Sequence, residues 1–130
     1  MIVVDASCLY EVVANGVNAE AVRAVLTDHD DQAAPHVVDV EVLGLVRRDA
    51  LAGRLDPTAA GLAVDDLRAW PGERFGHRGL LERAWELQPN IRTWDAVYVA
   101  LAEVLDAPLL TFDRRLARAK GPRCSFVILA

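Results

Sequence analysis

The sequence predicts an α/β protein with three layers, α/β/α, around a mostly parallel central sheet of four to five strands. Short apolar segments that can form buried strands alternate with longer segments whose apolar residues recur at helical spacing. One or two helices separate successive strands, which requires crossover connections and therefore parallel pairing. The 130 residues contain no repeat and no low-complexity linker, so we expect one domain over residues 1–130.

In the amino-terminal half, turn and capping residues separate the apolar segments. Asn15-Gly16 is a turn signal that divides one helical segment in two. Asp39 is a candidate N-cap for the helix that follows the second strand. The expected elements are a strand at 2–4, helices at 6–14 and 19–26, a strand at 33–37 and a helix from Asp39 to Ala52.

In the carboxyl-terminal half, Asp56-Pro57 places a capping residue ahead of a proline suited to the first position of a helix. The segment TWDAVYVALAE, which begins at Thr93, has strong helical periodicity. The expected elements are helices at 57–69, 80–87 and 93–105, an edge strand at 72–77, a strand at 108–112, a short helix from Asp113 and a last strand at 125–129.

The charge balance is acidic overall but uneven along the chain. With 14 basic and 19 acidic residues the net charge is −5, which by itself argues against a nucleic-acid partner. The segment from Arg114 to Arg123, however, contains five basic residues and no acidic one. Such a local patch can bind a phosphate chain, although cations near the end of a helix are also favoured by the helix dipole alone.

Nothing at the amino terminus resembles an export signal. The strand at 2–4 is far too short to span a bilayer or to form a signal peptide, and no basic region precedes a long apolar run. We therefore expect a cytoplasmic protein that does not associate with membranes. Cys8 and Cys124 have no CxxC spacing, so buried, reduced thiols are expected at both positions.

Four acidic residues from distant parts of the chain are expected at one edge of the sheet. Asp5 and Asp113 directly follow predicted strands. Glu41 and Asp95 lie near the first turn of predicted helices. Because active sites of open parallel sheets lie beyond the carboxyl ends of the strands, these four carboxylates are the candidate catalytic residues.

Each carboxylate also has a purely structural interpretation. Asp5 and Asp113 are both in position to cap a helix, although Ser7 could cap the first helix equally well. Asp95 is favoured by the positive end of its helix dipole. Glu41 is harder to explain in this way, because it lies within an apolar run. From the residues alone, both interpretations remain open at every position.

Four carboxylates in one place would repel one another and raise one another's pKa, so such a cluster is costly without a cation. Ligands that are all oxygen atoms suit Mg²⁺ or Mn²⁺ rather than zinc. Such an ion keeps some of its waters and accepts phosphate oxygens of a substrate as further ligands. The pattern therefore indicates hydrolysis of a phosphodiester by a metal-activated water.

The four acidic segments resemble the successive motifs of a known family. MIVVDAS, PHVVDVEV, TWDAVYVALAE and LLTFDRRL are similar to the motifs of PIN-domain nucleases, specifically the VapC-type toxins of toxin–antitoxin pairs. The resemblance extends over essentially the whole chain. It implies a PIN-like fold, Mg²⁺-dependent endoribonuclease activity, a homodimer and a cognate VapB-type antitoxin.

The resemblance also assigns roles to individual residues. Asp5 and Asp95 would be the firmest metal ligands, and the other two acids would bind directly or through water. Ser7 matches a small hydroxyl position beside the metal site. The residues that match the acidic quartet are Asp5, Glu41, Asp95 and Asp113, and the arginines expected to meet the RNA backbone are Arg114, Arg115 and Arg118.

Other functional classes remain compatible with acids at strand ends. A phosphoacceptor receiver module needs a lysine near the site, and the only lysine, Lys120, lies in the basic segment. A phosphatase with Asp5 as nucleophile is disfavoured, because its usual Asp-x-Asp start is absent. The alternative function is therefore a non-hydrolytic module with an acidic pocket, either receiver-like or protein-binding.

Overall fold

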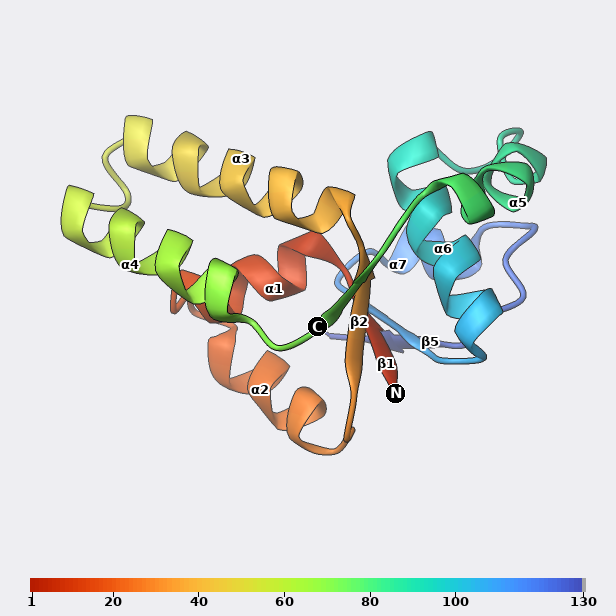
Figure 1. The fold of residues 1–130 in the computed structure, drawn as a ribbon, viewed down its shortest axis with the longest axis horizontal. Coiled ribbons are helices and arrows are strands. Elements are labelled where there is room, and N and C mark those ends of the chain that lie inside the picture. The colour runs from red at the N-terminus through yellow and green to blue at the C-terminus, as the bar shows by residue number, and fades with distance from the viewer. Residues whose placement is uncertain (130) are drawn as a thin grey trace.

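The central sheet consists of five strands, all paired in parallel, over residues 1–129, which the computed structural model describes (Figure 1). The strand order is β3-β2-β1-β4-β5. The predicted sheet of four to five strands is confirmed, with five strands observed. The pairing was predicted to be mostly parallel, and all four strand pairs are parallel. The strands are β1 (Ile2–Val4), β2 (Gln32–Pro35), β3 (Glu73–Phe75), β4 (Leu109–Thr111) and β5 (Phe126–Ile128).

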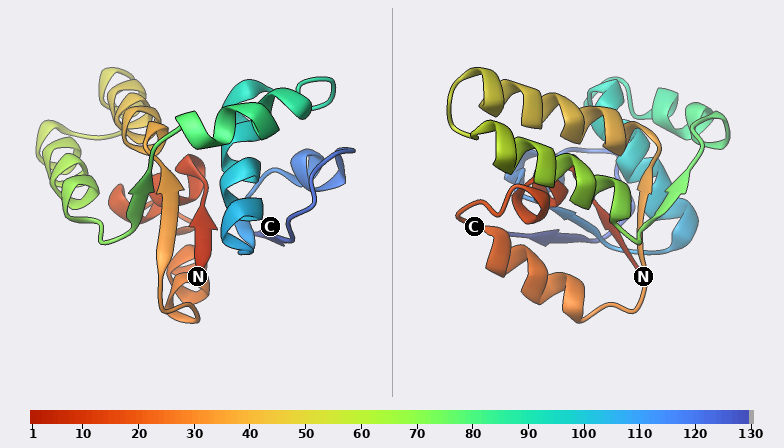
Figure 2. Two further views of the ribbon diagram at one scale, coloured as in Figure 1. Left: turned by 45° about the vertical axis from the view of Figure 1, so that its right-hand side comes forward. Right: turned by 60° about the vertical axis from the view of Figure 1, so that its left-hand side comes forward.

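Helices cover both faces of this sheet, which confirms the three-layer architecture (Figure 2). Helices α1 to α4 contact one another on one side, whereas α5 packs on α6 and α6 packs on β1, β2 and β4 on the other. Within residues 1–129 the helices are α1 (Ala6–Val13), α2 (Ala19–Thr27), α3 (Val37–Leu51), α4 (Pro57–Ala69), α5 (Leu81–Glu86), α6 (Thr93–Leu105) and α7 (Arg114–Arg118), with a 3₁₀ turn at Arg78–Leu80.

Strand β1 lies in the middle of the sheet and of the core. All three of its residues are fully buried, because neighbouring strands flank it on both sides and helices cover both of its faces. Val3 is paired with Ala33 of β2 and with Leu109 of β4. Asp5, the residue after β1, therefore lies at the centre of the carboxyl edge of the sheet.

Two helices begin and end where the sequence predicts. The Asp56 side chain accepts a hydrogen bond from the Ala59 N–H at 2.7 Å and caps α4, with Pro57 as its first residue. Helix α6 starts at Thr93 and stops at Asp106, which adopts a left-handed conformation with φ of 49°. The predicted helix at 80–87 is preceded by the 3₁₀ turn and is shorter, ending at Glu86.

The predicted boundary between the second strand and its helix is wrong. Strand β2 ends at Pro35 and α3 begins at Val37, so Asp39 is not the N-cap but lies in the first turn. The Val37 N–H donates to the His77 Nε2 at 3.0 Å. Asp39 instead forms an ion pair with Arg74 of β3, with 2.9 Å between Oδ1 and Nη2. The His77 side chain, from the segment that follows β3, thus satisfies one N–H group of the helix terminus.

Both cysteines are free thiols, as predicted. Cys8 is fully buried, but the prediction of a buried thiol at Cys124 is wrong, because this residue is only partly buried next to the last strand. Between residues 1 and 129, none of the helices has the length and apolar character needed to cross a bilayer.

Candidate active site

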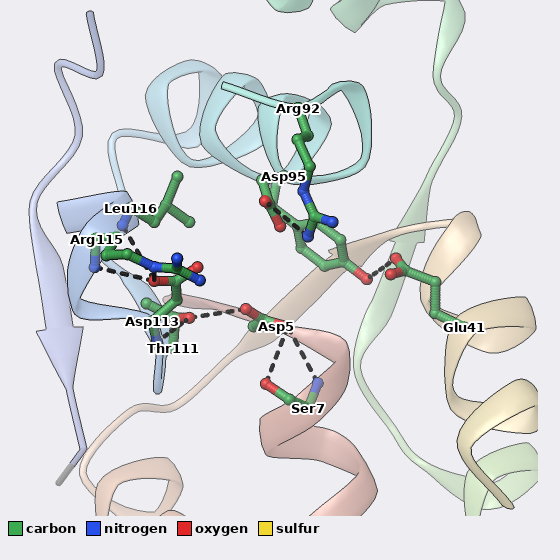
Figure 3. A network of polar contacts seen from close by, with 10 residues as sticks. Asp5, Ser7, Glu41, Arg92, Asp95, Thr111, Asp113, Arg115 and Leu116 are labelled. Atoms are coloured by element: carbon green, nitrogen blue, oxygen red, sulfur yellow. Dashed lines mark hydrogen bonds and ion pairs between the residues drawn. The ribbon is translucent and has the colours of Figure 1, made fainter. Parts of the chain in front are cut away.

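A cavity of about 360 Å³ at the carboxyl edge of the sheet is lined by all four predicted acids, Asp5, Glu41, Asp95 and Asp113. We refer to it as the acidic cavity. Figure 3 shows Asp5 between Asp113 on one side and Glu41 on the other, with Asp95 on the nearby end of α6. The structure thus brings together four carboxylates that are distant in sequence, as the topology predicts.

Asp5 is held by three hydrogen bonds from two residues, Ser7 and Thr111. Its Oδ1 accepts the Ser7 N–H at 3.0 Å and the Ser7 hydroxyl at 3.3 Å, so Asp5 is the N-cap of α1. Its Oδ2 accepts the Thr111 hydroxyl at 2.8 Å. These bonds fix the orientation of the carboxylate, and they show that Ser7 supports Asp5 rather than replacing it as the cap.

Thr111 links two of the acids, and sequence reasoning missed it. It is fully buried at the end of β4, where its hydroxyl donates to Asp5 and accepts the Asp113 N–H at 3.0 Å. The hydroxyl group therefore uses both its donor and an acceptor position within the site. The available signal was a single polar residue at the end of the otherwise apolar strand LLT.

Asp113 is both a helix cap and part of the acidic cavity. Its Oδ1 accepts the N–H groups of Arg115 at 2.9 Å and Leu116 at 3.3 Å, which satisfies the first turn of α7. Asp5 has the same dual role at α1. The structural and functional interpretations of these two residues are therefore compatible, since a capping carboxylate still has lone pairs that can face the cavity.

Tyr98 holds Glu41 in place and, like Thr111, was not predicted from the sequence. The Tyr98 hydroxyl of α6 donates to Glu41 Oε1 at 2.8 Å and so joins α6 to α3. Burial raises the pKa of Glu41 above its ordinary value; the Tyr98 hydrogen bond opposes this shift, whereas the negative charges of Asp5 and Asp95 add to it. Glu41 therefore carries its charge at a cost that a bound cation would relieve.

The pKa of Asp95 is raised in the same direction as that of Glu41, and burial is again the main cause. Burial raises its pKa, the guanidinium of Arg92 opposes the shift, and the charges of Asp5 and Asp113 reinforce it. The ion pair with Arg92 is loose, with 3.5 Å between Nη2 and Oδ2, and the Arg92 side chain is 81% exposed. One exposed arginine therefore compensates only part of the negative charge.

This raised pKa predicts that Asp95→Asn stabilises the protein in the absence of divalent ions. Because the folded state holds the Asp95 proton more tightly than the unfolded state, ionisation costs stability, and this cost appears as the pH rises through the raised pKa. We expect Asp95→Asn to raise Tm by a few degrees at pH 7 and by less at pH 4, measured by thermal unfolding in EDTA. Asp66→Asn, at an exposed carboxylate of α4, is the control; a lower Tm for Asp95→Asn at pH 7 would contradict the prediction.

The predicted RNA-binding arginines all lie on α7 and are exposed. Arg115 is 3.9 Å from Asp113, between Nε and Oδ1, and lines a second cavity that shares Arg92, Asp95 and Asp113 with the acidic cavity. Among the three, Arg115 is thus the one that the structure places beside the acids.

The sequence of residues 2–122 matches the PIN domain family. The chain belongs to this family. It is 38% identical over 129 residues to Ribonuclease VapC1 of Mycobacterium tuberculosis, covering 98% of this chain and 96% of the relative. It is 40% identical over 119 residues to Ribonuclease VapC3 of the same species, covering 91% and 86%. Within the PIN domain family the chain is therefore of the VapC type.

Solved structures of toxin–antitoxin proteins share the fold of this chain. VapBC2 from Rickettsia felis, bound to a DNA fragment from its promoter, superposes with a TM-score of 0.72 at 13% identity over the whole of both chains. A toxin–antitoxin complex from Klebsiella pneumoniae superposes with a TM-score of 0.65 at 18% identity, covering 98% of this chain and 96% of that one. The predicted PIN-like fold is confirmed.

The donor set of this PIN domain suits a hard divalent cation, because the cavity offers four carboxylates and no sulfur or imidazole ligand. In the part of the chain from 1 to 129, no group of three His, Cys, Asp or Glu side chains is close enough to bind one ion directly. Mg²⁺ usually keeps several waters and uses one or two protein carboxylates. The residues therefore fit an ion held directly by two carboxylates and through water by the others.

Proposed function

We propose that this chain is the toxin of a toxin–antitoxin pair and acts as a Mg²⁺-dependent endoribonuclease that hydrolyses RNA phosphodiester bonds, with Mn²⁺ as an alternative ion. The observation that carries the proposal is the acidic cavity, to which four segments that are distant in sequence each contribute one carboxylate. The relatives named as VapC ribonucleases, which match nearly the full chain, support the choice of RNA as the substrate.

In the proposed mechanism, Asp5 and Asp95 would bind the metal directly, and Glu41 and Asp113 would bind it through water. When bound, the ion supplies an activated water and stabilises the negative charge that develops on the phosphate. The carboxylate of Asp5 is held in place by Ser7 and Thr111. This fixed orientation lets the site bind the ion without rearranging Asp5.

The arginines of the site would orient the phosphate chain. Arg92 and Arg115 lie on either side of Asp95 and Asp113 and have mostly exposed side chains, so both can reach substrate from the rim of the cavity. Arg114 and Arg118 would contribute to the same positive surface of α7. No side-chain nucleophile is required, because water attacks the phosphorus in line with the leaving oxygen.

The test is cleavage of single-stranded RNA by the purified chain with Mg²⁺, with Mn²⁺ and with EDTA. We expect cleavage with either ion and none with EDTA. Mg²⁺ at saturating concentration should also raise Tm, because an ion that binds only the folded state stabilises it. RNA that remains intact with both ions, together with an unchanged Tm, would contradict the proposal and favour a protein-binding acidic pocket.

We also propose a cognate VapB-type antitoxin as the protein partner, with both proteins in the cytoplasm. Solved proteins of the same fold include VapBC2 and a toxin–antitoxin complex, which supports a partner of this kind. An antitoxin that inhibits RNA cleavage would have to cover or enter the acidic cavity.

A homodimer is the third part of the proposal, and an exposed apolar stripe on α3 supports it. Val40, Leu43 and Leu51 lie on the solvent side of the helix with exposed fractions of 68%, 49% and 71%. Such a stripe is costly in water and is typical of an interface. Val40 and Leu43 lie in the first half of the helix and Leu51 is its last residue, with the exposed Arg47 and Arg48 between them, so a second copy would pack on both apolar parts.

We therefore expect the double substitution Val40→Lys and Leu43→Lys to convert a dimer into a monomer. Two desolvated charges at an interface oppose association, while the exposed positions leave the fold unchanged. The measurement is sedimentation equilibrium, and Val104→Lys on α6, which is 67% exposed, is the control. A monomeric parent chain, or a double variant with the mass of a dimer, would show that α3 is not the dimer interface.

A further inference from the structure

A third cavity adjoins the acidic cavity on the side of α1 and α3. Its volume is about 640 Å³, and it shares Ser7 and Leu45 with the acidic cavity. We call it the α1–α3 cavity. Because the cavity beside Arg115 also shares lining residues with the acidic cavity, the acidic cavity has two neighbouring cavities, one on the side of α7 and one on the side of α1 and α3.

One wall of the α1–α3 cavity is apolar. It includes Leu45 of α3, Leu55 of the following loop and Phe112. Phe112 lies between Thr111 and Asp113 and is half-buried, so its side chain belongs both to the edge of the core and to the wall of this cavity. An aromatic ring beside a catalytic carboxylate provides a surface on which any nucleobase can stack.

Another part of the cavity wall is positively charged. It is formed by Arg48 of α3 and Arg54 of the following loop, and both side chains are held by ion pairs. Arg48 Nε and Arg54 Nη2 lie 3.1 Å and 2.7 Å from the same oxygen of Asp49. Tyr10 donates to the other oxygen of Asp49. The Arg48 and Arg54 side chains are nevertheless 58% and 60% exposed. Two guanidinium groups thus share one carboxylate and keep free N–H donors toward solvent.

The charges of the two cavities differ. Arg48 and Arg54 face two carboxylates in the α1–α3 cavity, Asp49 and Glu11, and Glu11 also accepts a hydrogen bond from the Asn18 amide at 2.8 Å. The acidic cavity has four carboxylates and a single arginine among its lining residues. A phosphate next to the cleaved bond therefore meets far less repulsion in the α1–α3 cavity than it would beside the acids.

We propose that the α1–α3 cavity binds the nucleotide of the RNA substrate that is next to the cleaved bond. Its base lies against Phe112 and Leu45, and its phosphate lies toward Arg48 and Arg54. The inference rests on the proposed ribonuclease function and adds a second substrate anchor on the side of the acids opposite Arg115. The combination of an apolar wall and fixed cations is typical of sites for single-stranded nucleic acid.

Charged substitutions at Val17 test whether RNA binds in this cavity, and they should not disturb folding. Val17 lines the α1–α3 cavity and is 98% exposed, so it accepts a charge of either sign. With single-stranded RNA and Mg²⁺, we expect Val17→Glu to raise KM about threefold and Val17→Lys to lower it by about the same factor, with kcat unchanged. Val104→Glu and Val104→Lys place the same charges at the far end of α6 and should leave KM unchanged.

Arg48→Gln is the second variant, because Arg54 keeps its two contacts with Asp49 when Arg48 is lost. We expect its KM to rise about fivefold with Tm close to the parent value. An unchanged KM for Arg48→Gln, or equal effects of charge at Val17 and Val104, would overturn the inference and leave this cavity to a protein partner. If the parent chain cleaves no RNA, the proposed function itself fails, which is a distinguishable result.

Discussion

Asp5→Asn is expected to abolish Mg²⁺-dependent RNA cleavage while the protein stays folded. The substitution removes the negative charge that would bind the metal. It preserves the size of the side chain and an oxygen that can accept the Ser7 N–H, and Asn caps helices as well as Asp does. We expect the cleavage rate to fall by at least about 100-fold, equivalent to about 2.7 kcal/mol, and Tm to change by only a few degrees.

The chain offers a matched control for this variant. Asp56 is the N-cap of α4 and accepts a backbone N–H in the same way as Asp5, but it lies outside the acidic cavity. Asp56→Asn should therefore leave both the cleavage rate and Tm close to the parent values. Cleavage by Asp5→Asn at the parental rate would show that the Asp5 charge has no part in catalysis and that Asp5 is only a cap.

Thr111→Val is expected to damage both stability and activity, although Thr111 would not itself bind the metal. Valine has nearly the same shape, but it cannot donate to Asp5 or accept the Asp113 N–H. Leaving such groups without their partner costs about 1–3 kcal/mol in the free energy of unfolding, to be measured by urea denaturation. Because the orientation of Asp5 is then lost, the cleavage rate should fall roughly 10- to 100-fold.

Thr111→Ser separates the hydroxyl group from the methyl group. Serine keeps both hydrogen bonds and loses only one buried methyl group, so it should cost about 1 kcal/mol of stability and retain most of the cleavage rate. If Thr111→Ser and Thr111→Val reduced cleavage equally, the loss would come from packing, and the proposed role of the hydroxyl group would be wrong.

The carboxylates of the candidate site could be predicted because their placement follows from local patterns and one topological rule. Asp5 and Asp113 follow strands, and Asp95 lies in the first turn of α6. Once the strands are known to be parallel, their carboxyl ends must share one edge. Helix α3 begins at Val37 rather than after Asp39, but this does not affect the prediction for Glu41. Glu41 lies in the second turn of the helix and lines the acidic cavity.

The residues that support the carboxylates could not be predicted in this way. Thr111 contacts Asp5 across 106 positions of sequence, and Tyr98 contacts Glu41 across 57. The sequence of neither element identifies the partner: a threonine also suits a strand for its shape alone, and a tyrosine on a buried helix face suits the core. The structural and functional interpretations of Asp5 and Asp113 also stayed open, because a capping position gives no information about what the remaining lone pairs face.

The sequence by itself determined the order and type of most elements, the parallel sheet and the edge at which the acids gather, because periodicity, capping and turn residues act over a few neighbouring positions. Only the tertiary structure decided how each acid is held, that two of them are buried enough to have raised pKa values, and that two further cavities adjoin the acidic cavity. Hydrogen bonds and desolvation at a site depend on which distant side chains meet there, and that is fixed only when the whole chain packs.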